Sequence, residues 1–172
     1  TRGYTPSIIL EYVTTKNELR YGMSLVPLEA NGPTMNWKIA DASSHTIEYT
    51  HRHLIKGMPG ALRLLGYFTT TNMGDYDQSI ALKPQSPIIA ATRSYRNTKY
   101  GFGINFEQTF NEALGTFFRA SWNDGHHETW AFTEIDHSIS GGISLGGNFW
   151  KRPADRLGMA YVTSGLSGPH RR

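Results

Sequence analysis

Apolar and polar residues alternate with a period of two along much of this chain, and no helical period lasts beyond three turns. The clearest stretch is 100–107, whose apolar positions are Tyr100, Phe102, Ile104 and Phe106. The positions between them hold Gly, Asn or Glu. Because successive side chains of a strand point to opposite faces, this pattern predicts a β-strand with one apolar and one polar face.

Eight segments show this alternation. The predicted strands are 7–14, 18–26, 46–54, 60–68, 100–109, 113–122, 138–147 and 155–164. The links between them are alternately short and long along the whole chain, which is typical of outer-membrane barrels with short periplasmic turns and long external loops. A strand of about ten residues tilted by about 40° rises roughly 25 Å, which matches the apolar band of such barrels. The pattern therefore predicts an all-β fold, an antiparallel up-and-down transmembrane β-barrel.

The composition of the two predicted faces also favours a membrane barrel. One face carries Tyr, Phe, Leu, Ile and Trp, whereas the other carries Gly, Ser, Thr, Glu and Arg, and Lys is nearly absent from the strands. A soluble barrel would instead show an apolar interior and an exterior dominated by Lys and Glu. The alternative that stays open is a soluble β-barrel or β-sandwich that binds a small ligand.

Composition excludes several classes of function. Lys plus Arg total 17 and Asp plus Glu total 14, so the net charge is +3, and there is no long basic run to bind nucleic acid. The chain has no cysteine, which excludes disulfides, zinc–thiolate sites and a cysteine nucleophile. His126 and His127 precede Glu128, but no third ligand has regular spacing. We therefore expect no cofactor and no metal.

From Pro87 onward, six short motifs follow one another in a characteristic order. They are 88–93 (IIAATR), 99–108 (KYGFGINFEQ), 118–125 (FRASWNDG), 131–136 (AFTEID), 150–155 (WKRPAD), and 165–167 (GLS) with His170 and Arg171. This region resembles the carbohydrate-selective porin family, the OprB type, of Gram-negative outer membranes. The match is looser over residues 1–86.

The resemblance implies a sixteen-stranded, water-filled barrel that lies in outer-membrane lipid and passes mono- or oligosaccharides by diffusion. Assembly into a homo-oligomer stays open. Eight strands are about half of such a barrel, and a closed barrel of eight would be filled by side chains and could not pass a sugar. We therefore expect residues 1–172 to form a single β-barrel domain that is an incomplete segment of the barrel.

Charged residues on the polar faces are the first candidates to line the pore and bind sugar. They are Glu11, Arg20, Glu48, Arg52, Arg63, Glu107 and Arg119. Guanidinium and carboxylate groups can replace the hydrogen bonds that sugar hydroxyls make with water. The same residues could instead form cross-strand ion pairs that only satisfy one another.

The two longest loops add further candidates. The segment 69–99 predicts a short helix over 76–82 and offers Arg93, together with Arg96, as constriction charges. The loop 123–137 combines aromatic residues with Glu134 and Asp136, which suits contact with a saccharide. These two carboxylates could alternatively be the acid–base pair of a membrane hydrolase. Carboxylates this close in sequence are common, so we expect a protein that is not an enzyme.

Overall fold

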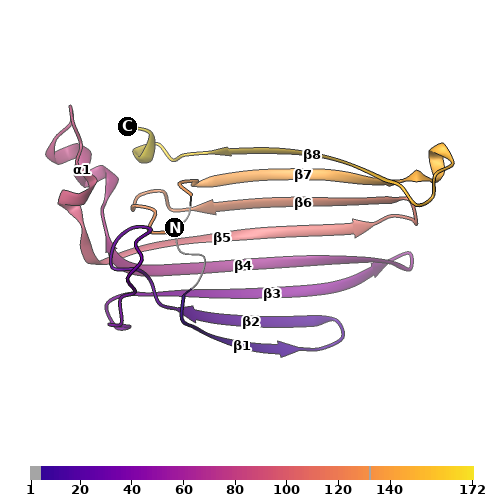
Figure 1. The fold of residues 1–172 in the computed structure, drawn as a ribbon, viewed down its shortest axis with the longest axis horizontal. Coiled ribbons are helices and arrows are strands. Elements are labelled where there is room, and N and C mark those ends of the chain that lie inside the picture. Colours follow the sequence, from indigo (N-terminus) through magenta and orange to yellow (C-terminus); the bar gives the residue numbers. More distant parts are fainter. Residues whose placement is uncertain (1–4, 132) are drawn as a thin grey trace.

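The chain forms one curved sheet of eight antiparallel strands in sequence order (Figure 1). The computed structural model describes residues 5–131 and 133–172, with only the backbone at Arg96. The strands are β1 (Ser7–Val13), β2 (Asn17–Ser24), β3 (Ser43–Ile55), β4 (Met58–Met73), β5 (Ser94–Thr109), β6 (Leu114–Asn123), β7 (His137–Gly146) and β8 (Arg156–Gly165). The prediction of eight strands in up-and-down order is confirmed.

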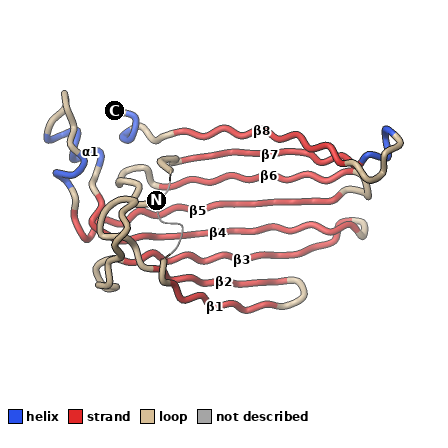
Figure 2. Tube along the Cα trace, in the orientation of Figure 1, coloured by secondary structure: helices blue, strands red, loops and turns tan. Residues whose placement is uncertain are grey.

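Short and long links lie at opposite ends of the sheet (Figure 2). At the turn end, Lys56 and Gly57 join β3 to β4 with φ values of 51° and 80°. Two successive left-handed residues make a hairpin turn whose twist matches that of the strands. At the loop end lie the predicted helix, α1 (Tyr76–Leu82), and the chain's C-terminal segment. The remaining helical turns are η1 (Ile89–Thr92), η2 (Gly147–Trp150) and η3 (Pro169–Arg171).

Strands β4 and β5 are longer at the loop end than the alternation predicted, so the predicted loop 69–99 is shortened to 74–93. Apart from Met73 and Tyr95, the added residues are polar on both faces, so no apolar alternation marks them as strand. They are still good strand residues, because Thr is β-branched and pairs well across strands. The hydroxyls of Thr70 and Thr98 lie 2.8 Å apart, and those of Ser44 and Thr69 lie 2.7 Å apart.

The sheet has no second layer against it in the described chain, so its apolar face remains exposed. Leu10, Phe102 and Leu157 are 63%, 58% and 57% exposed. Apolar surface on this scale exceeds what a soluble monomer shows and marks a surface that another apolar phase covers. No helix among the described residues is long and apolar enough to cross a bilayer.

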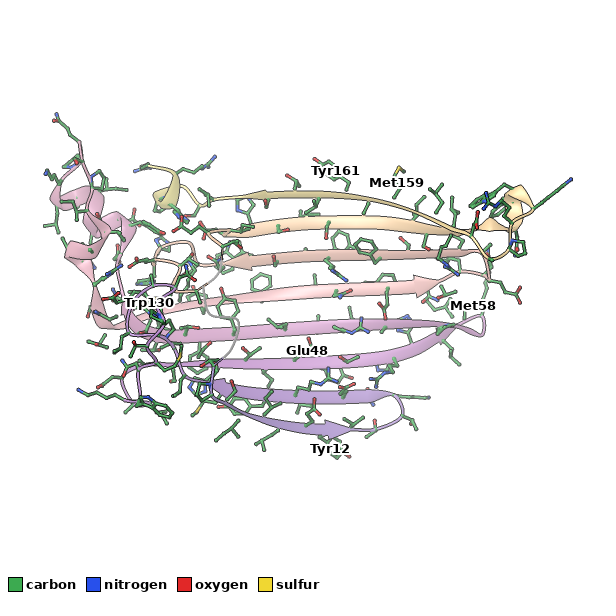
Figure 3. All side chains as sticks on the ribbon, in the orientation of Figure 1. Tyr12, Glu48, Met58, Trp130, Met159 and Tyr161 are labelled. Carbon is green, nitrogen blue, oxygen red and sulfur yellow. The ribbon has the colours of Figure 1, made fainter. Side chains whose placement is uncertain are left out.

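A small dry cluster lies at the loop end rather than within the sheet. It consists of Val26, Ala42, Met73 and Trp130, all 6% exposed or less. Figure 3 shows Trp130 among the loops, whereas Met58 lies at the turn end. This cluster holds the links 25–42 and 124–136 against the end of β4.

Candidate functional site

The polar face of the first three strands carries a row of alternating charges. Glu11, Arg20 and Glu48 are direct partners in the strand register. Arg20 donates from Nε to Glu11 Oε1 at 2.6 Å and from Nη1 to Glu48 Oε1 at 3.2 Å. Figure 3 places Glu48 in the middle of the sheet. The register thus brings together three of the residues that the sequence nominated.

Glu18 joins this network, although it is not among the residues predicted from the sequence. Its carboxylate is 2% exposed and forms salt bridges with Arg20 and Arg52. The signal was available, because Glu18 is two positions before Arg20 and therefore shares its face. Arg52 is consequently held by a buried carboxylate rather than left free.

A second charged group lies further along the polar face. Arg63 donates from Nη2 to Glu107 Oε1 at 2.9 Å across β4 and β5. Arg119, on β6, forms no salt bridge with any described residue, and its guanidinium lies 5.2 Å from the ring centroid of Phe117. Of the four arginines nominated from the strands, three are ion-paired and one is not.

The polar face is hollowed along its length. A hollow of about 460 Å³ lies over the centre of the sheet, where its lining includes Glu48, Arg63 and Arg119. A larger one of about 1180 Å³ lies toward the turn end and includes Arg52 and Glu107. Five of the seven nominated strand charges therefore border open space on the polar side of the sheet.

Arg93 lies at the loop end, where it is engaged by other residues. Its guanidinium donates to both carboxylate oxygens of Glu128, at 2.9 and 2.7 Å, and lies 5.3 Å from the ring centroid of Trp130. The hydrogen bonds to Glu128 raise the pKa of Arg93 above its ordinary value. This bidentate pair ties η1 to the loop 124–136 and can fix both over the end of the sheet. The side chain of Arg96 lies outside the described residues.

Asp136 is buried at the same end, whereas Glu134 is exposed. Asp136 Oδ2 accepts from the backbone N–H of Ser167 at 2.8 Å and lies 2.8 Å from Nδ1 of His170. Its other oxygen, Oδ1, lies 3.6 Å from Nζ of Lys99. Glu134 is 63% exposed and reaches Nε2 of His170 only at 3.5 Å. Asp136 thus connects the loop before β7 to the segment after β8.

This position makes the loop end sensitive to acid. Burial alone would raise the pKa of Asp136, but the hydrogen bonds from Ser167 and His170 and the charge of Lys99 outweigh it and hold the pKa below the ordinary value of 3.8. A depressed carboxyl pKa contributes stability that is present above pH 3.8 and is lost as the pH falls through the lower value. We expect residues 166–172 to exchange amide hydrogens faster below about pH 4.

Asp136→Asn is the matched variant for this prediction. It should raise exchange in residues 166–172 at neutral pH and remove the acid-dependent step, because the amide does not titrate. Hydrogen exchange followed by mass spectrometry between pH 2 and 7, corrected for intrinsic rates, provides the measurement. An acid-dependent step of unchanged size in the variant would contradict the assignment.

The neighbouring histidines do not form a metal centre in the described part of the chain. His126 Nδ1 lies 2.9 Å from Asp77, and His127 Nδ1 lies 3.0 Å from Asp124. The two rings face different carboxylates, as adjacent residues in an extended segment would. No group of three or more potential ligands among the described residues is arranged to hold an ion.

Comparisons with known proteins agree with this geometry. A high-pH structure of Pseudomonas putida OprB superimposes with a TM-score of 0.73 and 17% identity over 97% of this chain, which spans 41% of that protein's length. The likeness shows the fold, that of an antiparallel transmembrane β-barrel. The comparison with curated protein sequences gave no significant match. The model of the carbohydrate-selective porin, OprB family, matches residues 8–172, so this chain belongs to the OprB family of carbohydrate-selective porins.

Proposed function

We propose that this chain forms part of the wall of a water-filled β-barrel through which sugars diffuse passively across a Gram-negative outer membrane. The observation that carries this proposal is the division between the two faces of the sheet. One face is hollowed and carries Glu11, Arg20, Glu48, Arg63 and Glu107, and the other is apolar and exposed. A wall between lipid and water needs that division.

The polar face suits sugars because its charges are mostly matched. Ion-paired carboxylates and guanidiniums keep hydrogen-bonding capacity toward the lumen without presenting a strong net charge of one sign. A neutral sugar can exchange water for these groups and leave again, since each contact is weak and partly solvated. The Glu134–Asp136 pair does not suit hydrolysis, because Asp136 is 2% exposed and already bonded to Ser167 and His170.

Swelling of proteoliposomes tests the proposal with the natural full-length protein. Isotonic arabinose and glucose should enter and cause swelling, and a larger oligosaccharide should enter more slowly. Ser140→Trp adds a bulky ring to the polar face and should slow entry, whereas Ile139→Trp, the adjacent position on the apolar face, should not. Absence of swelling by the unmodified protein, or equal slowing by both variants, would contradict the proposal.

A further inference from the structure

One row of the polar face has hydrogen-bonding capacity that no described residue uses. The register places Arg63, Asn105, Arg119 and Ser140 side by side on β4 to β7. Arg63 donates a hydrogen bond to Glu107. The side chains of Asn105 and Arg119 have no hydrogen-bond or salt-bridge partner among the described residues. The other charges nominated from the strands are ion-paired, so this row differs from its surroundings.

Asn105 shows the same lack of a partner in an independent way. Its Oδ1 is shielded from solvent and has no hydrogen-bond partner among the described residues. Buried polar atoms are almost always satisfied, so this oxygen, beside the hollow, is available for a hydrogen bond from a bound molecule. The amide turns easily about χ2, and either its oxygen or its nitrogen can then be directed into the hollow.

Arg119 is oriented by an aromatic ring. The guanidinium lies 5.2 Å from the centroid of Phe117, which covers one flat face and leaves the N–H edges available. Those edges match the two oxygens of a carboxylate in bidentate geometry. Glu107 is close enough to attract Arg119 electrostatically, but it is bonded to Arg63 and forms no salt bridge with Arg119.

Part of the remaining lining of this hollow is small and bears hydroxyls, beside the apolar residue Leu65. Gly103, Ser121, Ser138 and Ser140 border the same space of about 460 Å³, large enough for one sugar ring. Serine hydroxyls both donate and accept, as sugar hydroxyls do. An unpaired cation beside such a surface fits a ligand with one anionic group and several hydroxyls.

We infer that Arg119 and Asn105, with the serines of β6 and β7, form a mid-wall subsite for acidic sugars, in which Arg119 binds the carboxylate and Asn105 a neighbouring hydroxyl. This inference rests on the proposed function and adds a substrate class to it. The subsite makes the channel discriminate between a hexuronate and the corresponding neutral hexose.

The test uses the natural full-length protein in planar bilayers, with D-glucose and D-glucuronate as probes. The measurement is the concentration of each sugar that blocks half of the single-channel current. Glucuronate should block at a lower concentration than glucose. Arg119→Gln should raise the glucuronate value about threefold to tenfold and leave that of glucose nearly unchanged. Asn105→Ala should weaken both sugars about equally.

Arg156→Gln is the matched control. It removes the same charge from the same half of the wall, at the turn end, where Arg156 donates to Ser144 at 3.1 Å. It should leave the preference for glucuronate in place. Equal loss in both arginine variants, or no preference in the unmodified protein, would overturn the subsite. A channel that conducts neutral sugars without preferring glucuronate leaves the proposed function intact, whereas one that admits neither sugar contradicts that function itself.

Discussion

Ile104→Arg is expected to destabilise the folded, membrane-inserted protein by about 2–4 kcal/mol, the cost of a cation at the lipid-facing midplane of a barrel. Ile104 lies on β5 near the middle of the apolar face, opposite Leu64 and Ala120 in the register. The measurement is urea unfolding of the natural full-length protein in phospholipid vesicles, followed by tryptophan fluorescence.

Gly103→Arg is the control for that substitution. Gly103 is the preceding residue and faces the hollow side, where an added Cβ would meet its nearest neighbours only at 3.7 and 4.0 Å. The added charge should therefore remain in water and lower the free energy of unfolding only slightly. If the two variants lost similar stability, or if Gly103→Arg were the worse, the assignment of the faces to lipid and water would be wrong.

Trp130→Ala is expected to open the loop end while leaving the sheet intact. Trp130 is 4% exposed, packs with Val26, Ala42 and Met73, and donates from Nε1 to the carbonyl of Pro27 at 2.6 Å. Removing a buried tryptophan costs about 3–5 kcal/mol, because it leaves a cavity and here also an unpaired carbonyl. The loss of stability should be confined to the links 25–42 and 124–136, since few other apolar residues hold them against the sheet.

Limited proteolysis of the membrane-inserted protein measures this effect. Cleavage within 25–42 and 124–136 should become much faster, and the far-ultraviolet circular dichroism of the sheet should be unchanged. Trp37→Ala is the control, because Trp37 lies in the same link but is 72% exposed. Cleavage rates that match in the two variants would show that the dry cluster does not hold the loops.

The alternation of side chains allowed the strands and faces to be predicted, because strand periodicity is a local property of the chain. It assigned Glu11, Arg20 and Glu48 to one face, and the register then placed them in one row. The alternation did not reveal the strand ends that flank the long loop. Thr and Asn occupy both faces of β4 and β5 there, so no apolar contrast marks the strand.

The sequence could not show which residue each nominated charged side chain is bonded to. Glu18 was not predicted because it stands at the very start of its strand, before the apolar alternation begins at Leu19, although it lies on the same face as Arg20. Arg93 and Asp136 were nominated for contact with sugar, and their partners, Glu128 and His170, lie 35 and 34 positions away along the chain. Contacts of such separation depend on how loops pack, which no local pattern encodes.

The sequence alone therefore determined the order, direction and sidedness of the strands, because these follow from a two-residue repeat and from link lengths. Only the tertiary structure decided which charges are ion-paired and which remain available. Arg63 and Arg119 look alike in the sequence, yet one has a carboxylate on its own face within reach and the other lies against Phe117. The reason is physical: a salt bridge depends on distances of a few ångströms across strands, and the fold sets those distances.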